Sequence, residues 1–270
     1  MQVSPPGAAA AVPPAAPEVP AAPAAPAASA AAPADAPALL CLPYAGGAAQ
    51  AFTGLRTALS ATARTELLEL PGHGRRMAEP VRDDFGEVLN DLVRSSAPHT
   101  TGHYVLLGYS MGAAFAYELA RHWSALGRPP SGVVLVGRNG PTARRPFPDI
   151  HRLAAPAFLD AVRRLGGTPP QLFERPELIE LFAPMLRADF TLSETYEPLP
   201  GPPLGCPLWV CAGTDDPMVD DAGLRDWENH ASGDVCIEWL PGGHFLLDEA
   251  AFHAYVGGVL RALPRPRARC

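Results

Sequence analysis

A chain of 270 residues, 47% of them hydrophobic, can bury one substantial core, and α/β folds of this size commonly form one domain. The formal net charge of −7 argues against a nucleic-acid-binding protein, because a surface that tracks phosphates normally gives a basic excess. The five cysteines show no CxxC or metal-ligand spacing, which predicts reduced thiols and no metal site, and their odd number favours the cytoplasm.

The first 37 residues differ in composition from the rest of the chain. They contain 17 alanines and 10 prolines, and prolines at this density prevent a helix or a strand ladder. The segment has neither a basic n-region nor an unbroken apolar stretch, so it predicts neither a signal peptide nor a membrane span. We expect residues 1–37 to be a disordered Ala/Pro-rich tail, with a tether to a larger assembly as the alternative.

From Ala38 onward, short apolar runs alternate with amphipathic stretches. Runs of this length predict six strands, at residues 39–42, 66–70, 104–107, 133–136, 208–212 and 235–240. Apolar residues at helical spacing predict helices around Leu55, after a cap at Asp83 or Asp84, and from residue 111 to the stop at Gly127. The alternation predicts an α/β protein with a mainly parallel sheet flanked by helices.

One stretch interrupts this alternation. Between the strands at 133–136 and 208–212 there are two helical patterns, around Phe158 and over residues 177–196, and no strand pattern. An insertion here would cover the carboxyl edge of the sheet, where open α/β folds bind ligands. We therefore predict a helical lid over about residues 145–200.

The pentapeptide from Gly108 to Gly112 contains the candidate nucleophile, Ser110. It lies where an apolar run ends and a helical pattern begins, so it predicts a strand-turn-helix nucleophile elbow. Glycines two residues before and two after the serine leave room for this strained turn. A serine hydroxyl is a weak nucleophile on its own, so a base and oxyanion donors are required elsewhere.

The order nucleophile, acid, histidine selects the partners of Ser110. His244 follows the last strand in a Gly-rich loop and is the candidate base; His73 also follows a strand but precedes the serine, so it is the weaker alternative. The orienting acid should follow the strand at 208–212. Asp216 is favoured because Pro217 keeps its backbone extended, and Asp215 remains the alternative.

Two backbone amides are expected to stabilise the oxyanion. One belongs to Met111, directly after the serine, and the other to the loop after the first strand, Pro43-Tyr44-Ala45-Gly46-Gly47. Ala45 or Tyr44 would donate the second amide. The glycines of this loop allow a close approach of the backbone.

Six motifs in order resemble the type II thioesterases that accompany polyketide and nonribosomal peptide synthases. They are Leu-Pro-Tyr-Ala-Gly-Gly at 42–47, Leu-Pro-Gly-His-Gly at 70–74, Gly-Tyr-Ser-Met-Gly at 108–112, Leu-Arg-Ala-Asp-Phe at 186–190, Gly-Thr-Asp-Asp-Pro at 213–217 and Pro-Gly-Gly-His-Phe at 241–245. The resemblance implies an α/β-hydrolase fold over residues 38–263, followed by a C-terminal tail at 264–270.

The same resemblance implies hydrolysis of acyl groups from the phosphopantetheine arm of acyl or peptidyl carrier proteins. Ser110, Asp216 and His244 match the triad positions of the family. No cofactor, nucleic acid or membrane is implied, and a monomer is expected. Tyr44 and Tyr109 stand where the family often has phenylalanine or histidine, and we expect them to contact the substrate.

Three rival functions follow from the same residues. A carboxylesterase acting on free esters would use an identical triad. A cyclising thioesterase would share the fold but exclude water from the acyl-enzyme. A non-catalytic synthase-associated scaffold would have no need of a complete nucleophile, base and acid, which disfavours it.

Overall fold

The computed structural model describes residue 33 and residues 36–145, 149–168 and 173–263, and these contain a six-stranded sheet. Neighbouring strands all pair in parallel, in the order β2-β1-β3-β4-β5-β6. The strands are β1 (Ala38–Leu42), β2 (Arg64–Leu67), β3 (Tyr104–Tyr109), β4 (Gly132–Val136), β5 (Leu208–Gly213) and β6 (Val235–Leu240). This confirms the predicted α/β class with a parallel sheet. Apart from residues 33, 36 and 37, the expected tails at 1–37 and 264–270 lie outside the described residues.

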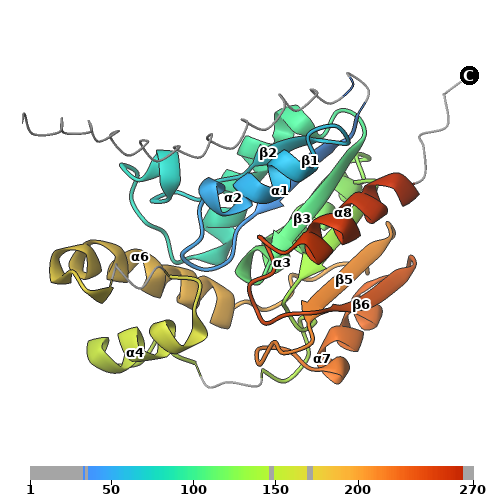
Figure 1. The fold of residues 1–270 in the computed structure, drawn as a ribbon. Helices are drawn as coiled ribbons and strands as arrows, with labels where there is room; N and C mark the ends of the chain where they lie inside the picture. The colour runs from blue at the N-terminus through green and yellow to red at the C-terminus, as the bar shows by residue number, and fades with distance from the viewer. Residues whose placement is uncertain (1–32, 34–35, 146–148, 169–172, 264–270) are drawn as a thin grey trace, which may run out of the picture.

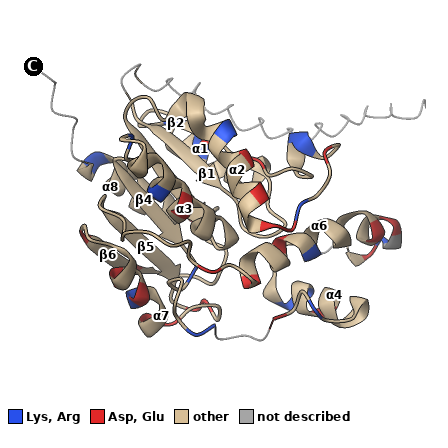
Figure 2. Cartoon of the chain, turned by 180° about the vertical axis from the view of Figure 1, so that it is seen from behind, with Lys and Arg blue, Asp and Glu red and all other residues tan. Residues whose placement is uncertain are grey.

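Helices cover both faces of the sheet (Figures 1 and 2). On one face α2 and α3 pack against the strands through side chains such as Leu92 and Phe115. On the other face α1 and α8 do so through Leu55 and Phe252. These helices are α1 (Thr53–Ala58), α2 (Phe85–Ser96), α3 (Met111–Ala125) and α8 (Ala250–Ala262), with a short α7 (Asp221–Arg225) after β5. No helix in the described part of the chain has the length and apolar character needed to cross a bilayer.

The insertion between β4 and β5 contains the two predicted helices, α4 (Ala155–Leu165) and α6 (Pro176–Glu194). Their facing side chains, among them Phe158 and Leu186, form a hydrophobic cluster separate from the two sheet faces. Figures 1 and 2 both show the pair side by side at one end of the sheet. Within the described residues of the insertion there is no strand, as expected from its sequence.

The predicted position of the second strand was wrong by a few residues. We expected residues 66–70, whereas β2 spans Arg64–Leu67 and pairs with β1 from Ala38 to Cys41. The buried run at Leu68 and Leu70 continues into the loop, while Arg64 is exposed because β2 is the edge strand. An apolar run marks burial rather than ladder pairing, which explains the shift.

The strand order changes direction at β1, and this positions the candidate site. From β1 the chain moves to β2 on one side and then crosses back to β3 on the other. Leu42 and Gly108 pair at the carboxyl ends of β1 and β3, so the loops that follow these strands start side by side and diverge. Open α/β sheets bind ligands in the crevice formed at such a switch point.

Candidate active site

Ser110 stands on a strained turn between β3 and α3. Its φ of 51° makes it the one non-glycine residue with positive φ among the residues that the structure describes. A side chain at Gly108 would collide with the backbone of Gly112 and Ala113, and one at Gly112 would collide with the carbonyl of Leu42. Gly108 is therefore required by close packing within the elbow, and Gly112 by packing of the elbow against the end of β1. The strain at Ser110 is typical of a functional turn.

His244 and Asp216 lie together at the carboxyl ends of the last two strands. The Nδ1 atom of His244 is 2.8 Å from Oδ2 of Asp216, whose side chain is fully buried. The other carboxylate oxygen, Oδ1, accepts a hydrogen bond from the amide of Met218 at 2.8 Å. Asp215 is exposed. The geometry thus joins His244 to Asp216 rather than to Asp215, and leaves Nε2 of His244 for another partner.

The sequence did not single out Gly137, which packs directly against this pair. Its φ is +61°, and a Cβ atom there would lie 3.1 Å from Cε1 of His244 and 3.4 Å from Oδ2 of Asp216. Glycine is favoured because the backbone is left-handed and the imidazole lies against it.

Gly137→Ala is expected to lower kcat/KM about ten- to a hundredfold by displacing the His244 ring, since small misplacements at a reacting centre cost activity on this scale. Gly127→Ala is the matched control, because Gly127 has a φ of +72° but open space around it. Steady-state kinetics and thermal midpoints of both variants check this. Equal activity losses in the two variants would refute a specific role of Gly137.

The two expected oxyanion donors belong to the start of α3 and to the loop after β1. The amide of Met111 is the first of α3, where helix N–H groups have no intrahelical acceptor. Ala45 and Tyr44 line the same cavity as Ser110 and His244, so the loop after β1 faces the nucleophile. Burial, followed by the charge of Asp248, raises the pKa of Tyr44, so its hydroxyl stays neutral.

Tyr109 occupies a different place from the one expected. It is fully buried and does not line the cavity. Its hydroxyl donates to the carbonyl of His244 and accepts from the amide of Leu246 at 2.7 Å. The structure therefore places this tyrosine beneath the His244 loop, where it holds the loop, rather than against a substrate.

A cavity of about 670 Å³ connects the candidate nucleophile to the helical insertion. Ser110 and His244 lie in its lining together with apolar side chains of α4 and α6 such as Val162, Leu165 and Phe190. Such a cavity suits an apolar ligand next to a polar reacting centre. The described residues contain no group of three His, Cys, Asp or Glu side chains placed to hold a metal ion.

Arg138 links the loop after β4 to the end of α6. It donates from Nη1 to Oγ of Ser193 and from Nη2 to the Ser193 carbonyl, both at 3.0 Å, and stacks over the Tyr196 ring. Burial lowers the pKa of Arg138 to about 10, which leaves it cationic at neutral pH. Its role in this structure is to anchor the insertion at the cavity wall.

His73, the alternative base, has other partners. It is 3% exposed, and its Nε2 atom lies 2.8 Å from Oδ2 of Asp189 on α6. It does not appear in the cavity lining that contains Ser110 and His244. The structure thus brings together Ser110, His244, Asp216, Met111, Tyr44 and Ala45, and separates His73 and Tyr109 from them.

Comparisons with known proteins identify the family of the chain. The family model described as "Thioesterase domain" matches residues 37–263. Thioesterase PikA5 of Streptomyces venezuelae is 35% identical over 222 residues, which cover 81% of this chain and 78% of that protein.

Solved structures of thioesterases share the fold. RedJ, a thioesterase from the prodiginine biosynthetic pathway of Streptomyces coelicolor, superposes with a TM-score of 0.77 at 32% identity, covering 88% of this chain and 96% of that one. YbtT, a type II thioesterase from the yersiniabactin NRPS/PKS biosynthetic pathway, gives a TM-score of 0.79 at 26% identity, with coverages of 87% and 96%.

Proposed function

The chain belongs to the thioesterase family, and we propose that it hydrolyses acyl groups from the phosphopantetheine arm of carrier proteins in polyketide or nonribosomal peptide synthesis. Its similarity to type II thioesterases of such pathways supports this assignment. The observation that carries the proposal is the cavity in which Ser110 and the Asp216-bound His244 meet an apolar chamber beneath the insertion.

In the proposed acylation step, Ser110 attacks the thioester carbonyl while Nε2 of His244 takes the hydroxyl proton. Asp216 accepts from Nδ1 of His244, which fixes the tautomer and stabilises the imidazolium that forms. The amides of Met111 and Ala45 donate to the oxyanion, a contribution worth about 10²- to 10³-fold in kcat per donor. Collapse of the tetrahedral intermediate expels the pantetheine thiolate, which takes the proton from His244.

In the proposed deacylation step, water replaces the departed thiol. His244 removes a proton from the water as it attacks the acyl-Ser110 carbonyl, and returns that proton to the serine oxygen as the free acid leaves. The oxyanion donors act twice, because each step passes through a tetrahedral intermediate. The residues of the chain suffice for both steps.

We propose a single catalytic domain over residues 38–263, with tails on either side. Within it, α4 and α6 belong to a lid over about residues 145–200. The lid proposal rests on the apolar cluster of the insertion, which forms one wall of the cavity. A monomer is sufficient, because one chain supplies every group that the proposed mechanism uses.

A direct test compares hydrolysis of an acyl-phosphopantetheinyl carrier protein with hydrolysis of the same acyl group as a simple ester. We expect kcat/KM for the carrier thioester to exceed that for the ester by at least about a hundredfold, because binding energy from the arm and carrier lowers the barrier. A third substrate, the N-acetylcysteamine thioester of the same acyl group, separates thioester reactivity from carrier recognition. A preference for the free ester would favour a carboxylesterase, and failure to hydrolyse any of the three would favour a scaffold.

A further inference from the structure

A buried carboxylate of the insertion reaches the loop that carries the proposed oxyanion donor. Asp189 of α6 is completely buried, and its Oδ2 atom accepts a hydrogen bond from the amide of Gly46 at 2.6 Å. Gly46 directly follows Ala45. The same Oδ2 atom contacts Nε2 of His73 at 2.8 Å, while Oδ1 is buried without a hydrogen-bond partner. One oxygen of the insertion therefore bridges the loop after β1 and the loop that carries His73.

The partners of the His73 ring favour the doubly protonated form. Nδ1 lies 3.0 Å from the carbonyl oxygen of Pro71, which can only accept a hydrogen bond, so this nitrogen carries a proton. Nε2 faces the carboxylate of Asp189, which also accepts when ionised. With an ionised carboxylate opposite Nε2, both nitrogens donate in the imidazolium form alone, which makes the contact a charged pair of His73 and Asp189.

The surrounding charges agree with this state. Burial by itself lowers the pKa of His73, but the hydrogen bond and charge of Asp189, the Pro71 carbonyl and the charge of Glu69 together raise that pKa above its ordinary value. The charged groups that face the ring are thus Asp189 from α6 and Glu69 from the segment after β2.

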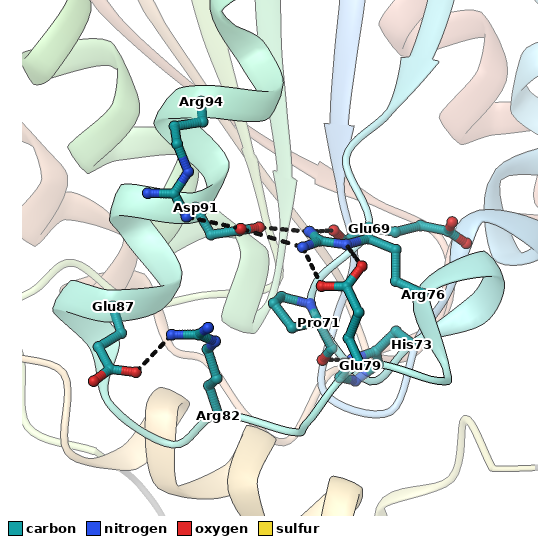
Figure 3. Close-up of polar contacts among 9 residues, drawn as sticks. All are labelled: Glu69, Pro71, His73, Arg76, Glu79, Arg82, Glu87, Asp91 and Arg94. Carbon is teal, nitrogen blue, oxygen red and sulfur yellow. Dashed lines mark hydrogen bonds and ion pairs between the residues drawn. The ribbon is translucent and has the colours of Figure 1, made fainter.

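The loop that carries His73 is itself fixed to the body of the domain (Figure 3). Arg76 donates to Asp91 of α2, to Glu79 and to the carbonyl of Glu69. The buried carboxylate of Glu69 in turn accepts from the amide of Ala49 at 3.4 Å. The loop after β1 is therefore held at two amides by two buried carboxylates, but only Asp189 belongs to the insertion.

We propose that Asp189, paired with His73, is a positioning residue that holds the oxyanion loop in its active conformation and makes that conformation depend on the seating of α6. This inference rests on the proposed function, because it takes Ala45 as an oxyanion donor. Leu186, one turn before Asp189, lies so close to Gly46 that a Cβ atom there would collide with it. Phe190, the next residue, lines the cavity, so a ligand that moves α6 also moves the anchor of the loop.

Asp189→Asn tests the positioning role, because asparagine keeps the size of the side chain and removes its charge. We expect kcat to fall about ten- to a hundredfold with KM changed less than about threefold, since a displaced oxyanion donor affects the transition state and not the bound ground state. Affinity for an alkylboronic acid, which forms a tetrahedral adduct with serine, should fall by the same factor as kcat.

Asp226→Asn is the matched control. Asp226 also joins a loop amide, that of Thr142 at 2.8 Å, to a histidine, His230, but has no contact with the loop after β1. It should keep wild-type kcat and boronate affinity. If Asp189→Asn matches this control, or if it loses activity only in proportion to lost folded protein, the positioning role is overturned.

Two measurements keep this inference separate from the proposed function. His73→Gln combined with Asp189→Asn should cost no more in kcat than the worse single variant, because the two residues act as one pair; additive losses would contradict the pair. If wild type and Asp189→Asn hydrolyse carrier thioesters equally well, the positioning role alone is refuted. A wild-type protein without such turnover refutes the proposed function.

The charge on His73 also predicts a pH dependence. A histidine whose pKa is raised in the folded state contributes stability that is fully present below its unfolded pKa of about 6.5 and is lost as pH rises through the folded pKa. The difference in thermal midpoint between wild type and His73→Gln should therefore be largest at pH 6 and shrink at alkaline pH. A difference that does not change with pH would show that the pair is neutral and overturn the charged pairing.

Discussion

Ser110→Ala is expected to lower kcat for acyl-carrier hydrolysis by about 10⁴-fold or more, because it removes the group that forms the acyl-enzyme. The fold should be unaffected. Ser110 precedes α3 without capping it through its side chain, and alanine at this φ carries a strain similar to that of serine. The thermal midpoint is therefore expected to stay within about 2 °C of wild type, a shift that corresponds to at most about 1 kcal/mol in a domain of this size.

Ser124→Ala provides the control for this variant. Ser124 lies in the last turn of the same helix, and its hydroxyl donates to the carbonyl of Ala120. Its loss should leave kcat unchanged. If purified Ser110→Ala still hydrolyses the acyl-carrier substrate, the serine mechanism is refuted.

Asp216→Asn should reduce kcat about 10²- to 10⁴-fold, whereas Asp215→Asn should change it less than about twofold. The amide of Met218 donates to Oδ1 of Asp216, so the asparagine oxygen will take that position and turn its NH₂ group toward His244. Nδ1 must then accept, which places the proton on Nε2 and removes the lone pair that deprotonates Ser110. Asp215 is exposed and has no such contact with the histidine.

Steady-state kinetics of both variants, with circular dichroism to confirm folding, decide between the two acids. A larger loss in Asp215→Asn would reassign the orienting acid. Equal losses would point to disruption of the shared loop rather than to a specific carboxylate.

The sequence predicted the strands, the helices and the nucleophile elbow because each depends on residues that are neighbours in the chain. The elbow was predictable because neither Gly108 nor Gly112 leaves room for a side chain at the tight turn into α3. Five of the six strands lie within two residues of the predicted runs, since buried parallel strands are continuously apolar. The edge strand β2 was displaced, because solvent on one side weakens that signal.

Contacts between distant segments were not predictable from one chain. His73 and Asp189 are 116 residues apart, and both motifs were visible in the sequence without any sign that they meet. Gly137 gave no pattern either, because its requirement comes from His244 packing against its backbone. Tyr109 was expected to meet substrate, yet the inward register of the last residue of β3 buries it under the His244 loop.

Detection of the acyl-enzyme tests the central claim most directly. Wild-type protein mixed with an acyl-phosphopantetheinyl carrier protein, quenched in acid within milliseconds and digested, should yield a peptide in which the acyl mass is attached to Ser110. The adduct should be absent from Ser110→Ala, and it should form more slowly in a His244 variant because His244 takes the serine proton during acylation. Turnover with the acyl group on another residue, or turnover that persists without any adduct and without Ser110, would contradict the account.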